Sequence, residues 1–182
     1  MKLNLPTLLT LGRIAILPVG VLFYLLPITY SHQLAAMCVA IVGVTDYFDG
    51  YLARIRNEIT NFGTFLDPIA DKLLVASVIL ILTSKEVITD WETIPALIIL
   101  LREIAVSGLR EYLAGLKVSV PVTKIGKLKT TIQLIALALL ILSESQLDLL
   151  PIMLIGNIAL WLAGLLTLYT GFDYLKSGLK HF

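Results

Sequence analysis

Long apolar runs recur from one end of this sequence to the other and constrain its fold more than any other feature. A helix needs about 20 mainly apolar residues to cross the hydrocarbon core of a bilayer. The runs cover about residues 7–26, 33–51, 66–83, 93–113, 127–142 and 149–175. Only helices and closed barrels satisfy all their backbone hydrogen-bonding groups in lipid. These runs lack the apolar–polar alternation of barrel strands. The sequence therefore predicts an all-α, polytopic membrane protein with six transmembrane helices.

The composition supports a membrane location. Of the 182 residues, 58% are hydrophobic and 15% are charged, whereas a soluble domain carries about a quarter charged residues. This excludes disordered, collagen-like and disulfide-rich classes. The net charge of +1 favours no nucleic-acid partner, and we expect none. The single cysteine, Cys38, lies in an apolar run, which predicts a buried, inert thiol. Short connections between the runs predict one domain over residues 1–182.

The basic residues are distributed unevenly between the two sides of the predicted bundle. The turns that follow the first, third and fifth apolar runs contain a single basic residue, Lys85, of the 14 lysines and arginines in the chain. All the others fall on the opposite side, together with both termini. Because cytoplasmic segments carry the excess of lysine and arginine, we expect that side to be cytoplasmic.

Four aspartates lie near the junction of the second and third apolar runs. Asp46 and Asp49 are three residues apart, and Asp67 and Asp71 are four apart, so each pair shares one face of a helix. The polar segment between the pairs brings the two helix ends together. All four carboxylates are therefore expected to face one cavity.

Two interpretations of this cluster are open. It can be a solvated interfacial loop, with ion pairs from Arg54, Arg56 and Lys72. Alternatively it is a functional site, as ionisable groups at membrane depth usually are. Carboxylate oxygens suit magnesium or manganese, and four carboxylates suffice for two such ions and a phosphate. Gly50 and Gly63 either end or pack helices, or they let a nucleotide approach the backbone.

The whole segment resembles the signature of the CDP-alcohol phosphatidyltransferase family, which reads Asp-x2-Asp-Gly-x2-Ala-Arg-x8-Gly-x3-Asp-x3-Asp. Every fixed position of the signature is met, by Asp46, Asp49, Gly50, Ala53, Arg54, Gly63, Asp67 and Asp71. The resemblance implies a six-helix membrane enzyme, commonly a homodimer, with a polar cavity that opens to the cytoplasm.

The resemblance also implies the chemistry. Members of the family transfer a phosphatidyl group from CDP-diacylglycerol to an alcohol and release CMP, with Mg²⁺ or Mn²⁺ neutralising the pyrophosphate. By this resemblance Asp46, Asp49 and Asp67 bind metal, and Asp71 is the base and a further candidate metal ligand. The positions that contact CDP-diacylglycerol are Asp46, Asp49, Gly50, Ala53, Arg54, Gly63 and Asp67.

Three further segments, 4–13, 102–111 and 126–131, resemble those family members whose acceptor is glycerol 3-phosphate. The resemblance implies that basic residues bind the acceptor phosphate, since arginine offers bidentate contacts and lysine a mobile charge. The candidates are Arg102, Arg110, Lys124, Lys127 and Lys129, with Asn4, Thr7, Arg13 and Thr60 as supporting positions. The expected location is a bacterial inner membrane.

Each of these assignments has an alternative. The lysines can simply attract anionic lipid. Arg102 and Arg110 can pair with Glu103, Glu111 or the aspartates, and Arg13 can snorkel to the interface. Another family member would use phosphatidylglycerol or a phosphorylated polyol as acceptor. A small transporter would also place carboxylates in the membrane, but at the midplane of related halves. No such repeat is present in this sequence.

Overall fold

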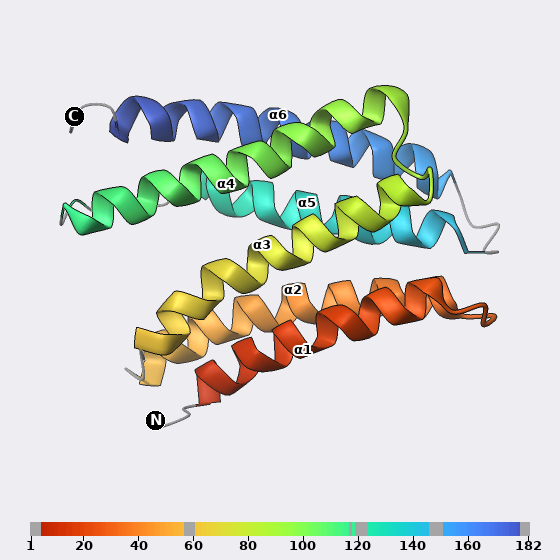
Figure 1. Ribbon diagram of the computed structural model, residues 1–182, viewed down its shortest axis with the longest axis horizontal. Helices are drawn as coiled ribbons and strands as arrows, with labels where there is room; N and C mark the ends of the chain where they lie inside the picture. Colours follow the sequence, from red (N-terminus) through yellow and green to blue (C-terminus); the bar gives the residue numbers. More distant parts are fainter. Residues whose placement is uncertain (1–4, 57–60, 117, 119–123, 146–150, 179–182) are drawn as a thin grey trace.

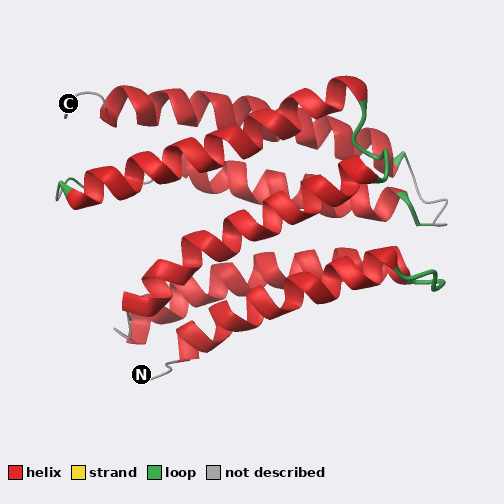
Figure 2. Cartoon of the chain, in the orientation of Figure 1, coloured by secondary structure: helices red, strands yellow, loops and turns green. Residues whose placement is uncertain are grey.

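The computed structural model describes residues 5–56, 61–116, 118, 124–145 and 151–178 (Figure 1). Over these residues the chain consists of long α-helices, one short 3-10 helix and no strand (Figure 2). The elements are α1 (Leu5–Leu25), α2 (Ser31–Arg56), α3 (Asn61–Ser84), η1 (Asp90–Glu92), α4 (Thr93–Gly115), α5 (Lys124–Ser143) and α6 (Ile152–Gly178). The expected all-α architecture is confirmed.

Consecutive helices run in opposite directions. The first residues of α1 and the last residues of α6 therefore lie at one end of the bundle, together with the ends of α2 and α4 and the starts of α3 and α5 (Figure 1). We call this end the site end. The last residues of α1, α3 and α5 lie at the opposite end (Figure 1). The arrangement agrees with the prediction that both termini share one side.

The packing joins the helices into one bundle. Helix α1 contacts α2 and α3, α2 contacts α5, and α6 contacts both α5 and α4. Leu82, Leu137 and Leu160 are fully buried in the resulting core. Small residues allow close approach, as at Gly164, where an added Cβ would lie 2.7 Å from the Cβ of Pro95. Close packing of this kind drives helix association in lipid, where the hydrophobic effect does not.

The outer surface of the bundle is apolar. On α6, Ile158, Leu165 and Phe172 are all more than half exposed, as expected for side chains that face lipid. Among the described residues three helical segments are long and apolar enough to cross a membrane, Leu8–Leu25, Ile125–Ser143 and Ile152–Lys176. The protein is therefore an integral membrane protein. The other three long helices, α2, α3 and α4, carry the candidate aspartates together with Arg102 and Arg110, and their crossing of the membrane stays a prediction.

Helices α2 and α3 extend beyond their apolar runs at the site end. Helix α2 continues to Arg56 and α3 begins at Asn61, so Asp46, Asp67 and Asp71 lie within helices and not at their ends. Hydropathy reports how much of a helix lies in lipid, whereas backbone hydrogen bonds continue into the polar interface. The carboxylates therefore project from regular, well-supported backbone.

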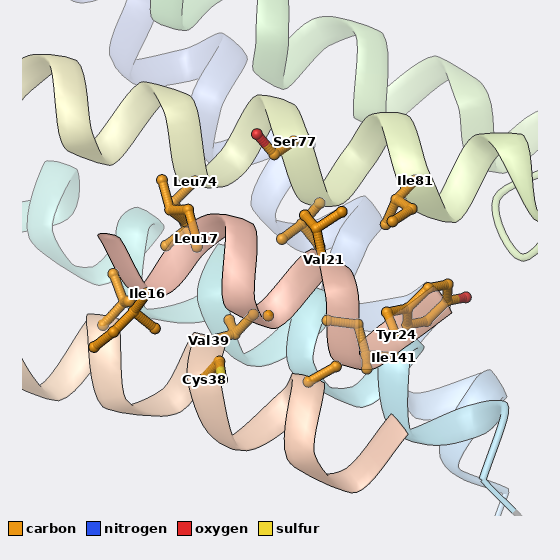
Figure 3. Close-up of a pocket in the computed structure, with 14 residues that line it drawn as sticks. Ile16, Leu17, Val21, Tyr24, Cys38, Val39, Leu74, Ser77, Ile81 and Ile141 are labelled. Atoms are coloured by element: carbon orange, nitrogen blue, oxygen red, sulfur yellow. The ribbon is translucent and has the colours of Figure 1, made fainter. Parts of the chain in front are cut away.

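An apolar pocket lies between α1, α2 and α3, lined by Leu17, Val21, Val39 and Leu74, among others (Figure 3). Its cavity measures about 20 Å³, which is about the space of one water molecule, so it is a packing defect and has no room for an acyl chain. Cys38 lines this pocket and is only partly buried, less than the sequence predicted.

Candidate active site

Three of the four predicted aspartates meet at the site end around one cation from α1. Arg13 Nη1 donates to Asp46 Oδ1 at 2.5 Å and to Asp71 Oδ1 at 3.2 Å. Arg13 Nη2 donates to Asp67 Oδ1 at 3.2 Å. The guanidinium has five N–H donors in a planar fork, which lets one side chain serve carboxylates from two helices. The site is thus assembled by α1, α2 and α3 together.

Burial in this cluster is asymmetric. The Arg13 side chain is 1% exposed, whereas the side chains of Asp46, Asp67 and Asp71 are 42%, 49% and 48% exposed. The cation therefore lies on the inner side of the cluster and the carboxylates open outward. A buried arginine is tolerated only with close partners, and it offsets the mutual repulsion of the carboxylates. Snorkelling, the alternative for Arg13, does not occur.

Thr10 belongs to the same cluster, although the sequence did not single it out. Its Oγ1 donates to Asp67 Oδ1 at 2.6 Å, and the side chain is 1% exposed. The available signal was its position three residues before Arg13, which places both side chains on one face of α1.

Several candidate residues fall where the structure does not describe a side chain. Asn4 and Thr60 lie outside the described residues. The backbone of the following residues is helical, but their side chains are not described: Thr7, Asp49, Gly50, Ala53, Arg54 and Lys124. Gly63 is described and is buried in α3.

The cluster has the donor chemistry of a divalent-cation site. Carboxylate oxygens are the ligands that Mg²⁺ and Mn²⁺ prefer, and the fold gathers three of them on one positive group. In the described part of the chain no three acidic, histidine or cysteine side chains form a group that could hold a metal ion; the three carboxylates are instead bonded to Arg13. The residues fit such an ion by charge and donor type.

A cavity of about 490 Å³ lies between α3 and α4, within the range of small-molecule sites. Its polar lining consists of Asp71, Lys72, Arg102, Glu103, Ser107, Arg110 and Glu111. Asp71 also belongs to the Arg13 cluster, so the cavity borders directly on the aspartates. Lys72 donates a hydrogen bond to Ser107 and thereby links the two helices. Lys72 was expected only as an ion-pair partner.

The described basic candidates occupy three different environments. Arg102 and Arg110 line the cavity. Lys129 is 2% exposed and forms an ion pair with Glu103, which itself lines the cavity. Lys127 is exposed and does not belong to the described lining. The structure therefore brings the two arginines to the cavity, holds Lys129 behind Glu103, and leaves Lys127 at the surface.

The ion pairs that the sequence suggested as an alternative role for these arginines are present in part. Arg102 Nη1 lies 3.4 Å from Glu103 Oε1. Arg110 instead donates from Nε to the hydroxyl of Tyr174 on α6, at 3.0 Å. Tyr174 was not predicted from the sequence. A tyrosine near the end of an apolar helix, with a polar tip and an apolar ring, was the available signal.

Comparison with known proteins identifies the family of the chain. Residues 3–169 match the family described as CDP-alcohol phosphatidyltransferase. The chain is 46% identical to the CDP-diacylglycerol–glycerol-3-phosphate 3-phosphatidyltransferase of Rickettsia bellii (strain RML369-C), over 98% of this chain and 97% of that protein. It is 42% identical to the protein of the same name from Escherichia coli (strain K12), over 97% of this chain and 96% of that protein. The chain therefore belongs to the CDP-alcohol phosphatidyltransferase family.

Proposed function

We propose that this protein is a phosphatidylglycerophosphate synthase: it transfers the phosphatidyl group of CDP-diacylglycerol to glycerol 3-phosphate and releases CMP in phospholipid biosynthesis. The position of Asp71 carries the proposal. This residue lies both in the carboxylate cluster and in the wall of a cavity that also contains Arg102 and Arg110. An acidic site for a metal-bound donor thus borders a cationic site for a phosphorylated acceptor.

The reaction is a direct displacement at phosphorus. The primary hydroxyl oxygen of glycerol 3-phosphate forms a bond to the phosphorus that carries the diacylglycerol. The bond from that phosphorus to the oxygen of CMP breaks, and CMP leaves with the electron pair. Asp71 takes the hydroxyl proton, a role that fits a carboxylate located between the donor and acceptor sites.

The donor site uses the family signature. When bound, two divalent ions (Mg²⁺ or Mn²⁺) would supply positive charge to the pyrophosphate, with Asp46, Asp49, Asp67 and Asp71 as their ligands. Gly50, Ala53, Arg54 and Gly63 are proposed to contact the cytidine nucleotide.

The acceptor site uses the cavity between α3 and α4. Arg102 and Arg110 are placed to bind the phosphate, because arginine pairs with phosphate oxygens through two N–H groups at once. Lys129 contributes by neutralising Glu103, whose charge would otherwise repel an anion. Lys124 and Lys127 remain proposed contacts, and Asn4, Thr7 and Thr60 remain proposed supporting positions.

The proposed setting is a bacterial inner membrane with the site end facing the cytoplasm, where a water-soluble acceptor and CMP can exchange. The supporting observation is the asymmetry of basic residues, all of which except Lys85 are assigned to that side. We also propose a homodimer, as the family resemblance implies.

An acceptor panel tests the function. The purified protein in detergent receives CDP-diacylglycerol, Mg²⁺ or Mn²⁺, and one acceptor at a time: glycerol 3-phosphate, phosphatidylglycerol or inositol phosphate. We expect CMP release with glycerol 3-phosphate alone, and a product that retains the phosphate of the acceptor. CMP release with another acceptor, and none with glycerol 3-phosphate, would refute the substrate assignment.

A further inference from the structure

Helix α6 supports the cationic wall of the cavity from behind. Arg102 and Arg110 both belong to α4 and line the cavity, whereas the described lining contains no residue of α6. Helix α6 nevertheless packs against α4, and it contacts each of these two arginines through a different residue. These contacts lie outside the family signature, which is confined to α2 and α3.

Tyr174 holds Arg110 in two ways. Its hydroxyl accepts a hydrogen bond from Arg110 Nε at 3.0 Å, and the guanidinium carbon lies 5.1 Å from the centre of the tyrosine ring. Both contacts restrict the guanidinium, and a cation over an aromatic face is attracted to it. Tyr174 is 8% exposed, so its ring is itself fixed by packing. Because Arg110 Nε donates to the tyrosine hydroxyl, the terminal Nη nitrogens are the ones we assign to the acceptor phosphate.

Gly171 makes room for Arg102. A Cβ added at Gly171 would lie 2.8 Å from Cγ of Arg102 and 3.5 Å from its Nε. That contact involves the stem of the arginine and not its flexible end, so a methyl group here would displace the whole side chain. Gly171 lies one helical turn before Tyr174, and the two residues therefore present one face of α6 to both arginines.

Building on the function proposed above, we propose that Tyr174 and Gly171 are positioning residues that set the affinity for the acceptor phosphate. They hold Arg110 and Arg102 in the orientation that a phosphomonoester dianion requires. Neither residue touches the reacting atoms. Rigid placement raises affinity because the arginines lose less freedom when the anion binds. Loss of this support therefore acts on the acceptor and leaves the nucleotide donor unaffected.

The first test is Tyr174→Phe, which removes the hydrogen bond and keeps the ring. CMP release by the full-length protein is measured against glycerol 3-phosphate and against CDP-diacylglycerol. We expect the KM for glycerol 3-phosphate to rise about three- to tenfold, as for one lost hydrogen bond, with an unchanged KM for CDP-diacylglycerol. The matched control is Tyr169→Phe on the same helix, where the side chain is 64% exposed and no effect is expected.

The second test is Gly171→Ala, compared with Gly108→Ala on α4, where an added Cβ meets nothing within 4 Å. We expect the KM for glycerol 3-phosphate to rise selectively in Gly171→Ala and not in Gly108→Ala. The thermal stability of Gly108→Ala should equal that of the unmodified protein. This inference alone is overturned if Tyr174→Phe and Gly171→Ala both keep an unchanged KM for glycerol 3-phosphate. It is also overturned if their KM values rise equally for glycerol 3-phosphate and CDP-diacylglycerol. Absence of CMP release with glycerol 3-phosphate from the unmodified protein overturns the proposed function and this inference with it.

Discussion

Arg13 is the residue on which the carboxylate cluster depends. One nearly buried guanidinium bonds Asp46, Asp67 and Asp71 through their Oδ1 atoms, and no lysine could do so with the same geometry, because an ammonium group is a point charge. The same contacts tie α1 to α2 and α3. A single side chain therefore serves both the electrostatics and the assembly of the site end.

Replacement of Arg13 tests this role. Arg13→Gln leaves three neighbouring carboxylates without their shared cation. Because these carboxylates are nearly half exposed, we expect the free energy of unfolding to fall by about 2 kcal/mol in divalent-free buffer. Added Mg²⁺ should restore part of the loss, because it supplies positive charge to the same oxygens. Thermal unfolding in detergent with and without EDTA measures both effects. Lys85→Gln, at the opposite end, is the control. Identical melting of Arg13→Gln and the unmodified protein would contradict the shared-cation role.

Asp71 is the residue for which a chemical role is proposed. Asp71→Asn keeps the shape of the side chain and removes the base, so we expect the rate of CMP release to fall by about 100- to 10,000-fold. Circular dichroism should show an unchanged helix content. The control is Asp173→Asn on α6, whose side chain is exposed. Activity of Asp71→Asn within tenfold of the unmodified protein would refute the assignment of the base.

At the scale of elements, α4 is the helix that connects the cavity to the rest of the bundle. Its face toward α3 lines the cavity, and its contacts with α6 hold the arginines. Glu103 on this helix pairs with Lys129 of α5. That lysine was predicted to bind the acceptor directly, and its 2% exposure instead favours a role through Glu103.

A double-mutant cycle tests the link between α4 and α5. Lys129→Met removes the closer of the two cations that pair with Glu103 and leaves it only the longer contact with Arg102. We expect a loss of about 2 kcal/mol in unfolding free energy, with a higher KM for glycerol 3-phosphate. Adding Glu103→Gln removes the stranded charge and should recover most of the stability. Denaturant or thermal unfolding of the four proteins measures the coupling. Additive losses in the double variant would show that the pair does not act as a unit.

At the scale of the whole molecule, the alternating helices separate two chemically different ends. The site end contains the end of α2 and the start of α3 (Figure 1), the helices that carry Asp46, Asp67 and Asp71. The described connections after α1 and α3 lie at the other end (Figure 1). The distribution of basic residues then predicts which end faces the cytoplasm. The orientation of the protein in the membrane, the cavity and the access of substrates to it thus depend on how all the helices pack together.

Cysteine labelling in intact cells tests the orientation. In a Cys38→Ala background, Lys85→Cys should react with a membrane-impermeant maleimide added outside. Lys176→Cys, exposed near the end of α6, should react only after the membrane is permeabilised. The Cys38→Ala protein alone is the control for background labelling. The reverse pattern would place the site end outside the cytoplasm.

The sequence alone determined the class of fold and the location of the acidic site. Apolar runs predicted the bounds of each long helix to within about five residues, with the largest differences where α2 and α3 extend into the site end, because lipid imposes both their length and their helical backbone. The spacing of Asp67 and Asp71 predicted a shared face, since a regular helix makes neighbours of residues four apart. Both inferences are local, and they need no knowledge of how one helix packs on another.

Only the tertiary structure decided which cations meet which anions. Arg13 lies 33 residues from Asp46, and Arg110 lies 64 from Tyr174, so these contacts depend on the rotation and depth of each helix against its neighbours. Apolar periodicity is too weak to set that rotation where a helix faces lipid on one side and packed side chains on the other. The basic residues therefore looked equivalent in the sequence, and packing alone separated the cavity arginines from the buried Lys129 and the exposed Lys127.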